Sequence, residues 1–411
     1  MSMREVKFSS LALGINNRRE PTRLAAGGEE ATFLYAADNV DIDAQGFVKR
    51  RAGTTRVLEE AVHSAWDHDG QYGFAVIDGV LTRLDPAGAG LLKTPVRPAM
   101  PRATVSYSLG ADGAVYWTNG AEIRRVVGSE DRAIATPRLD SAPVLSLTAG
   151  ALRAGRYLYA FTVQGTEGES AATVVQQIDV PEGGGLELSD AALDGLAVNL
   201  YLSGPNGEVL GLTQAATDGR FGVLAPVEAG RRCPTIETAP MPPGSIVCHF
   251  NGRMAVAAGR MLYFSPPYRY GLYEPASGYI PFPSEITVVE PCDVGLYICA
   301  DKTYWLTDFT SSRLQELLPY GALAESAVRS PAAKAAYWQS PRGLVRADMA
   351  GGVQNLQEAA VAFGPAERGA SLFRSFDGME HVVSTRAGAE QSVAVARSYM
   401  DAEIVRKGTQ P

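Results

Sequence analysis

The sequence predicts an all-β protein: a β-propeller of about six blades with an immunoglobulin- or fibronectin-like β-sandwich inserted into it. Three observations predict this fold. Short apolar hairpins recur about every 42 residues, and one interruption of roughly 97 residues separates two groups of them. The chain also has 43 glycines and 25 prolines among 411 residues, which fits a turn-rich β protein better than a helical bundle.

The repeat is visible in the positions at which the hairpins begin: Gly70, Gly113, Gly252, Gly295 and Gly378. Two of the gaps span 43 residues, and the 83 residues before Gly378 are two such units. The gap between Gly113 and Gly252 is one unit plus roughly 97 residues. We therefore expect propeller blades over 63–142 and 241–390, separated by an inserted domain over 143–240.

Each element of the propeller is expected from apolar strands on either side of a turn. Residues 1–62 form an N-terminal arm with strands at 31–35 and 47–57 around a turn at 43–46. The blade hairpins are 72–77 with 80–84, 114–118 with 121–127, 253–257 with 260–264, 296–300 with 304–306, 335–339 with 343–347, and 379–385. Asp78–Gly79 and Asn119–Gly120 are the favoured two-residue turns, in which both residues take a positive φ. Six units are counted, and five to eight blades fit because outer strands are weakly marked.

The inserted block has strands at 157–163, 173–178, 196–202 and 208–213, separated by glycine-rich turns. This spacing is typical of a sandwich, and the fibronectin-like variant is favoured because no Cys…Trp…Cys core is present. Short helices are expected only near 311–318 and 355–363. In the closing segment, 391–411, residues 392–399 and 403–405 form either a closing strand or a helix, and we favour the strand.

The charge of the chain argues against tight binding to nucleic acid. The net charge is −8, and the basic pairs at 18–19, 49–51, 124–125 and 231–232 are scattered. We interpret these pairs as solvated surface or local salt bridges. An acidic surface does suit a wall past which a polyanion must slide without adhering.

Cysteine usage and hydropathy predict a soluble protein made in the cytoplasm. The four cysteines show no C-x-x-C pair, and Cys299 lies in an apolar run typical of a core. No apolar stretch approaches the roughly 18 residues that cross a bilayer, and the first 13 residues lack the layout of a secretion signal.

A catalytic or metal site is not indicated. The four histidines are dispersed, and a calcium loop at Asp41 and Asp43 fails because Gln45 and Ala52 stand where ligands belong. Nucleophile-elbow, Walker and sialidase-box motifs are missing from the sequence. We therefore expect no catalytic residue, no metal and no cofactor.

The most distinctive segment is an aromatic, proline-rich loop over 265–286, since prolines this dense do not fit a central strand. Its candidate functional residues are Tyr268, Arg269, Tyr270, Tyr273, Tyr279 and Phe282. They either line a stacking site for a sugar or base, or hold the loop against its own domain or a neighbouring subunit. We favour the second alternative and treat them as a candidate subunit-contact loop.

The order of several motifs resembles the tail nozzle proteins of short-tailed bacteriophages. These motifs are SPPY at 265–268, YIPFPSEI at 279–286, GLY at 295–297, YWL at 304–306 and PYGA at 319–322. NVDI at 39–42 and GFVKRRAGT at 46–54 resemble the N-terminal signature of that family, with Ala52 in place of an expected proline. AGRYLYA at 154–160 and EGES at 167–170 are similar to sandwich modules of virion proteins.

The resemblance implies a homohexamer in the virion, placed below the head-to-tail adaptor, with an axial channel that retains the genome and opens for its ejection. The implied partners are adaptor or portal-side tail proteins, tail fibre or needle proteins, the passing genomic DNA and, transiently, the host envelope. Loop 265–286 and an N-terminal assembly segment with Asn39, Asp41, Arg50 and Arg51 are the candidate contacts. A carbohydrate- or receptor-binding tail propeller is the first alternative, and a hydrolase propeller the second.

Overall fold

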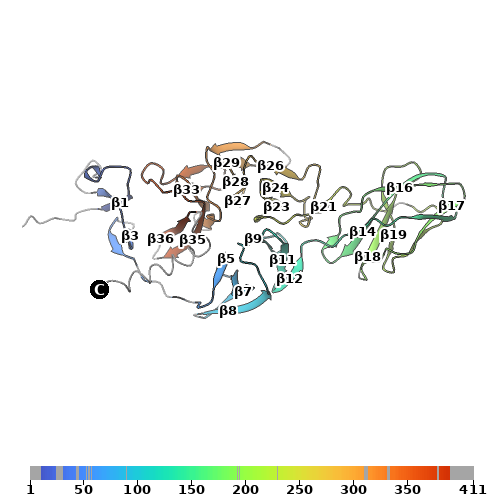
Figure 1. Ribbon diagram of the computed structural model, residues 1–411, viewed down its shortest axis with the longest axis horizontal. Coiled ribbons are helices and arrows are strands. Elements are labelled where there is room, and N and C mark those ends of the chain that lie inside the picture. The colour runs from blue at the N-terminus through green and yellow to red at the C-terminus, as the bar shows by residue number, and fades with distance from the viewer. Residues whose placement is uncertain are drawn as a thin grey trace, which may run out of the picture. The chain divides into compact units, whose positions relative to one another are not determined.

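The computed structural model describes residues 11–388, apart from 25–30, 43–45, 52, 54–55, 57, 89, 192, 194, 229, 310–312, 331–333 and 377–378. Within these residues the one helical element is a single turn, η1 (Pro21–Arg23), and all other regular structure is β-strand (Figure 1). None of the described residues belongs to a helix long and apolar enough to cross a membrane.

In the described part of the chain, five four-stranded antiparallel sheets follow one another, and we refer to them as blades 1 to 5. Blade 1 consists of β5 (Val62–His68), β6 (Tyr72–Ile77), β7 (Val80–Ala87) and β8 (Gly90–Arg97), and blade 2 of β9 (Ser106–Leu109), β10 (Val115–Thr118), β11 (Ile123–Val127) and β12 (Glu130–Ala133). Blade 3 consists of β22 (Ile246–Phe250), β23 (Arg253–Ala258), β24 (Met261–Phe264) and β26 (Tyr279–Pro281), and blade 4 of β27 (Val288–Pro291), β28 (Leu296–Cys299), β29 (Thr303–Leu306) and β30 (Gln315–Leu318). Blade 5 consists of β31 (Val328–Ser330), β32 (Ala335–Ser340), β33 (Gly343–Ala347) and β34 (Val353–Asn355). A two-stranded sheet, β35 (Arg368–Phe376) with β36 (Met379–Ala387), comes last. The protein is therefore a β-propeller with an inserted sandwich, as the repeat predicted.

The chain divides into two compact units. One unit is residues 62–282, with blades 1 to 3 and the sandwich. The other joins residues 1–61 to 283–411 and contains blades 4 and 5 and the final hairpin.

The second strand of each blade is buried along most of its length. All four residues of β10 and all four of β28 are buried. Because side chains of a strand alternate between its two faces, such a strand must be covered on both sides. The continuous apolar runs in the sequence are explained by this packing of blade on blade.

Blades 1 to 3 pack through two apolar clusters. Phe74 and Leu81 of blade 1 pack with Val115 and Trp117 of blade 2. Tyr116, on the opposite face of β10, packs with residues of blade 3 such as Met254. Alternate residues of one strand thus hold two neighbouring blades, which is the arrangement that makes a propeller rigid.

The two predicted hairpin turns differ from each other. Asp78 and Gly79 both have positive φ, as expected. At the second turn only Gly120 does, so that part of the prediction is wrong. There the side-chain oxygen of Asn119 accepts hydrogen bonds from the amides of Ala121 and Glu122, which favours a wider turn.

The inserted domain is a sandwich of two sheets. One sheet contains β13 (Ser146–Ala149), β17 (Gly184–Leu188) and β20 (Phe221–Val223). The other contains β14 (Gly155–Gly165), β15 (Gly168–Glu169), β16 (Gln176–Val180), β18 (Ala197–Leu202) and β19 (Gly211–Ala216). Tyr157, Tyr159, Phe161 and Val163 alternate along β14 and face the core between the sheets, as the sequence pattern predicted. Figure 1 shows these strands in green, beside blades 2 and 3 of the same unit.

The unit that contains the N-terminus begins with two small sheets. The first pairs β1 (Leu11–Ile15) with β2 (Ala31–Leu34), and the second pairs β3 (Val40–Ile42) with β4 (Val48–Arg50). The strand expected over 47–57 is therefore shorter than predicted. The side chain of Asn17 donates to the carbonyl of Ala362 at 3.1 Å and fastens the arm beside blade 5.

Both predicted helices are wrong. Residues 315–318 form β30, an outer blade strand paired with β29, because the blade edge offers hydrogen-bond partners that a short helix lacks. Residues 353–355 form β34, and the Asn355 side chain then accepts from the amides of Gln357 and Glu358 in a turn. The predicted turn at 377–378 and closing segment 391–411 lie outside the described residues.

Candidate functional site: a cavity between two blades and the sandwich

The segment 265–286 contains two short strands, so the prediction that it is entirely loop is wrong. β25 (Leu272–Tyr273) pairs with β21 (Ala239–Pro240), and β26 is the outer strand of blade 3. Pro281 fits in β26 because that strand is an edge strand, paired only with β24. On the unpaired side of an edge strand, a missing N–H costs no ladder hydrogen bond.

The six aromatic and basic residues singled out in this segment separate into two groups. Tyr268, Arg269 and Tyr270 line one cavity. The other three, Tyr273, Tyr279 and Phe282, do not. The rings of Tyr270 and Phe282 are buried inside the chain, whereas Tyr268 is 76% exposed and Tyr279 39% exposed. A role of this segment in subunit contact stays a prediction. Of the residues compared here, Tyr268 and Tyr279 are the ones exposed enough to make such a contact.

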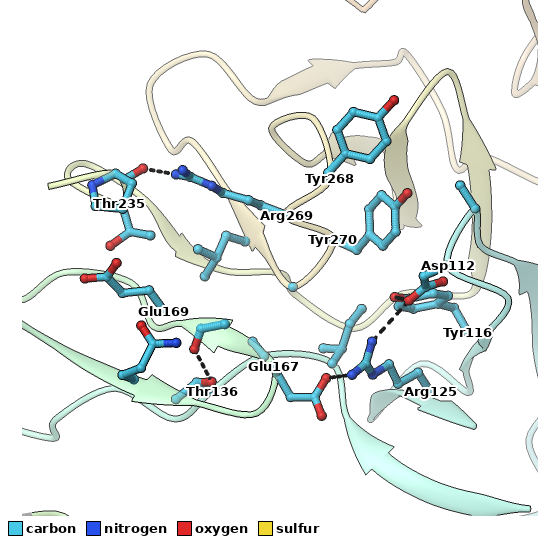
Figure 2. Close-up of a pocket in the computed structure, with 18 of the residues that line it drawn as sticks. Asp112, Tyr116, Arg125, Thr136, Glu167, Glu169, Thr235, Tyr268, Arg269 and Tyr270 are labelled. Carbon is cyan, nitrogen blue, oxygen red and sulfur yellow. Dashed lines mark hydrogen bonds and ion pairs between the residues drawn. The ribbon is translucent and has the colours of Figure 1, made fainter. Parts of the chain in front are cut away.

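The cavity has a volume of about 530 Å³ and lies where blade 2, blade 3 and the sandwich meet. Blade 2 contributes Asp112, Tyr116 and Arg125 to its wall, and the sandwich and its exit segment contribute the residues around Glu169 and Thr235. Figure 2 shows the side chains of these segments facing the space between them. The size lies within the range of roughly 300–1,000 Å³ that is usual for ligand sites.

Arg125 connects blade 2 to the sandwich. Its guanidinium forms ion pairs with Asp112, at 3.1 Å, and with Glu167 in the turn between β14 and β15. The hydroxyl of Tyr116 donates to the same Asp112 carboxylate at 2.8 Å. Burial raises the pKa of Tyr116, and that phenol stays protonated as a donor at neutral pH. This network fixes one wall of the cavity (Figure 2).

Glu169 forms the opposite wall. Its carboxylate accepts hydrogen bonds from the hydroxyls of Thr162 and Tyr201 and pairs with Arg231 at 2.8 Å. Burial by itself would raise the pKa of Glu169. The hydrogen bonds and the arginine outweigh burial and lower that pKa, so the group is a carboxylate at neutral pH. Buried Thr235 lies beside it, and apart from the Cys233 thiol its hydroxyl has no hydrogen-bond partner among the residues that the structure describes.

Tyr268 and Arg269 form the rim. Tyr268 has a φ of 58°, a left-handed conformation that is uncommon for a bulky residue. Its amide donates to the carbonyl of Gly252 at 2.8 Å, and its ring lies against the backbone of that glycine, where an added Cβ would come within 3.1 Å of the ring. Arg269 donates to the carbonyl of Pro234. The exposed ring is thus held by the hairpin turn between β22 and β23.

The predicted N-terminal assembly residues lie together on the β3–β4 hairpin. Arg50 pairs with Val40 in the ladder, and the amide of Arg51 donates to the carbonyl of Asn39 at 3.1 Å. Asp41 lies 3.9 Å from the guanidinium of Arg374 on β35. The structure therefore brings these residues to one place and does not test their role in assembly.

Nucleophilic chemistry is disfavoured at the thiols. All four cysteines are buried, and burial raises the pKa of Cys299 to about 12 and also raises those of Cys233 and Cys292. A protonated, buried thiol is inert. In the described part of the chain no group of three or more His, Cys, Asp or Glu side chains could hold a metal ion.

Sequence reasoning missed the charged residues of the cavity. Arg125 and Arg231 belong to the basic pairs that we interpreted as surface or local salt bridges. The ion-pair interpretation is confirmed for Arg124, Arg125 and Arg231. The only clue in the sequence was the opposite charge of these two basic pairs and of the closely spaced Glu167 and Glu169. No sequence pattern indicates that residues 112, 167 and 231 lie side by side.

Comparison with known proteins assigns neither a family nor a function to this chain. No family model and no curated protein matches the chain. Among solved structures, an inactive virginiamycin B lyase from Staphylococcus aureus with quinupristin matches at 12% identity and a TM-score of 0.31, over 81% of this chain and 97% of that one. BBS1N in complex with ARL6DN matches at 12% identity and a TM-score of 0.30, over 82% of this chain and 91% of that one. Sqt1 of Saccharomyces cerevisiae matches at 10% identity and a TM-score of 0.27, over 80% of this chain and 93% of that one. At these TM-scores the likeness carries no argument.

Proposed function

We propose that this chain is a structural subunit of the tail of a short-tailed bacteriophage, a nozzle protein that assembles as a homohexamer around an axial channel for DNA. The observation that carries the proposal is the order of motifs between residues 265 and 322, together with the signature near residues 39–54. The role is that of a wall, without catalysis and without a cofactor.

The positions of the motifs support this proposal. YIPFPSEI begins on β26, GLY leads into β28, and YWL lies on β29. These are blade strands and the turns that join them, so the resemblance falls on segments that determine how the blades are built. The N-terminal signature falls on the β3–β4 hairpin, and the three residues of β4 are exposed.

The physical properties of the blades suit a load-bearing ring. The second strand of each blade is buried along most of its length, so a blade deforms only if its neighbours also move. In a cyclic ring every subunit uses two different complementary surfaces. A net charge of −8 would let DNA pass with little adhesion, because adhesion needs clustered Lys and Arg.

The proposal includes its partners and its place. The ring would lie in the virion below the adaptor, contact portal-side tail proteins above and fibre or needle proteins below, and approach the host envelope at infection. The chain would be made in the host cytoplasm before assembly.

Electron microscopy of the purified full chain tests this function. We expect particles with six-fold symmetry and a central hole. Particles of a single chain at all concentrations, or a ring that is retained by double-stranded DNA at physiological salt, would contradict the proposal.

A further inference from the structure

We propose that the sandwich is a hinged domain, held in one orientation against blade 2 by a latch, the ion pair between Arg125 and Glu167. This inference goes beyond the structural role proposed above and does not depend on how many chains assemble. Three features of the connection carry it: two hinge points, a polar hollow beside them and the buried ion pair that spans the hollow.

The chain enters the sandwich through a hinge between Ala135 and Thr136. Ala135 still belongs to the blades, because a Cβ added to Gly271 in the loop of blade 3 would come within 2.6 Å of the Cβ of Ala135. Thr136 already belongs to the sandwich, since its hydroxyl donates to the carbonyl of Gly168, at the start of β15, at 2.8 Å. Two consecutive residues are thus attached to different domains.

The chain leaves the sandwich through a second hinge at Glu237. Cys233 is still bound to the sandwich, because its amide donates to the carbonyl of Leu210 at 3.0 Å. Ala239 already pairs with Tyr273 of the blade 3 loop. Between them Glu237 has a φ of 58°, a left-handed conformation that is uncommon outside glycine. Hinges are typically a few such loop residues, which absorb a change in φ and ψ when a domain moves.

The space between the sandwich and the blades is a polar hollow. Its volume is about 530 Å³, and its wall includes the charged residues Asp112, Arg125, Glu167, Glu169, Arg231 and Arg269. In the described part of the chain, the apolar cluster that joins blades 2 and 3 contains no residue of the sandwich strands, and the two sandwich clusters contain no blade residue. Domains joined by a small polar interface move relative to each other unless something else holds them. Apolar packing therefore does not fix the angle of the sandwich.

The latch fixes that angle by charge. The side chains of Arg125 and Glu167 are only 17% and 6% exposed, so water and salt screen this pair little. Arg125 is also held by Asp112 of blade 2 at 3.1 Å, which aims its guanidinium across the hollow (Figure 2). A swing of the sandwich would leave both charges without each other, which a buried pair strongly resists. Arg269 also crosses, to the carbonyl of Pro234, but it does so next to the exit hinge and so permits rotation about it.

Pulsed electron paramagnetic resonance on the full chain tests the hinge. Nitroxide labels are placed at Leu92→Cys on blade 1 and Val174→Cys in the sandwich, two positions that are 59% and 80% exposed. The four native cysteines are buried and do not compete for the label. An excess of unlabelled chain ensures that the distances are measured within one chain. We expect one narrow distance distribution with the latch intact and a second, shifted population in Arg125→Met.

A double variant, Arg125→Met with Glu167→Gln, removes the latch without leaving the Glu167 carboxylate unpaired, and it should show the same second population. The matched control is Arg231→Met with Glu169→Gln, the same changes in a pair that lies wholly within the sandwich at 2.8 Å. It should keep the single narrow distribution. The inference is overturned if the double variant keeps the narrow distribution, if the intact latch already gives two populations, or if the control gives the second population as well.

Discussion

Replacing Trp117 by phenylalanine tests the packing of blade 1 against blade 2. Trp117 is fully buried in the cluster between these blades, and its indole N–H donates to Asp131 at 3.2 Å. Asp131 also binds the guanidinium groups of Arg97 and Arg124, so the acceptor is charged. Losing a hydrogen bond to a charged group costs about 1.5–3 kcal/mol, and the smaller ring adds about 1 kcal/mol. We expect Trp117→Phe to lower the free energy of unfolding by about 2.5–4 kcal/mol.

Trp338→Phe is the matched control. Trp338 is equally buried, in the cluster between blades 4 and 5, but its indole N–H has no partner among the described residues. The same loss of volume is then offset by removing an unsatisfied buried donor, which is worth about 1–3 kcal/mol. We expect the free energy of unfolding to stay unchanged or to rise by up to about 2 kcal/mol.

Hydrogen exchange followed by mass spectrometry under native conditions measures both variants locally. Trp117→Phe should speed exchange in the inner strands of blades 1 and 2, β6 and β10, and leave the sandwich strands β14 and β18 protected. Equal effects of the two substitutions, or loss of protection confined to the sandwich, would refute the packing described here.

Three further predictions concern the cavity. Arg125→Met should lower the free energy of unfolding by about 3–5 kcal/mol, because it leaves the buried carboxylate of Glu167 unpaired; in a urea titration, adding Glu167→Gln should recover part of the loss. Glu169 has a lowered pKa, so its ionic contribution to stability is present above its unfolded pKa, near 4.5, and is lost as pH falls through the folded pKa. The stability difference between the unchanged chain and Glu169→Gln should therefore shrink in thermal melts as pH is lowered below about 4.5. Tyr268→Asn should change stability by less than about 1 kcal/mol, because the exposed ring packs little and asparagine tolerates the left-handed conformation.

Each of these has an outcome that contradicts it. For Arg125, full stability of the single variant would show that Glu167 has another partner. A difference at Glu169 that grows on acidification would reverse the sign of the linkage. A large loss of stability in Tyr268→Asn would show that the contact of the ring with Gly252 stabilises the fold.

The sequence was sufficient for the blades because their signals are local. The hairpin at 72–84 and the strand at 157–163 follow from alternating side chains and from glycine turns, which act over a few residues. The errors lie at blade edges: 315–318 contains too few residues to distinguish a helix from an outer strand, and pairing with β29 decided the outcome.

The cavity could not be predicted because it depends on contacts between distant segments. Asp112, Glu167 and Tyr268 lie more than 50 residues apart along the chain and meet only after the blades and the sandwich have folded. The positive φ of Tyr268 was also invisible, since no glycine or asparagine marks it. The aromatic composition of 265–286 identified the segment, and the structure determined which of its residues reach a cavity.

Native mass spectrometry of the full chain measures how many subunits assemble. We expect a closed assembly with a mass of six times 43.6 kDa. A protein that remains at 43.6 kDa under all conditions would contradict it.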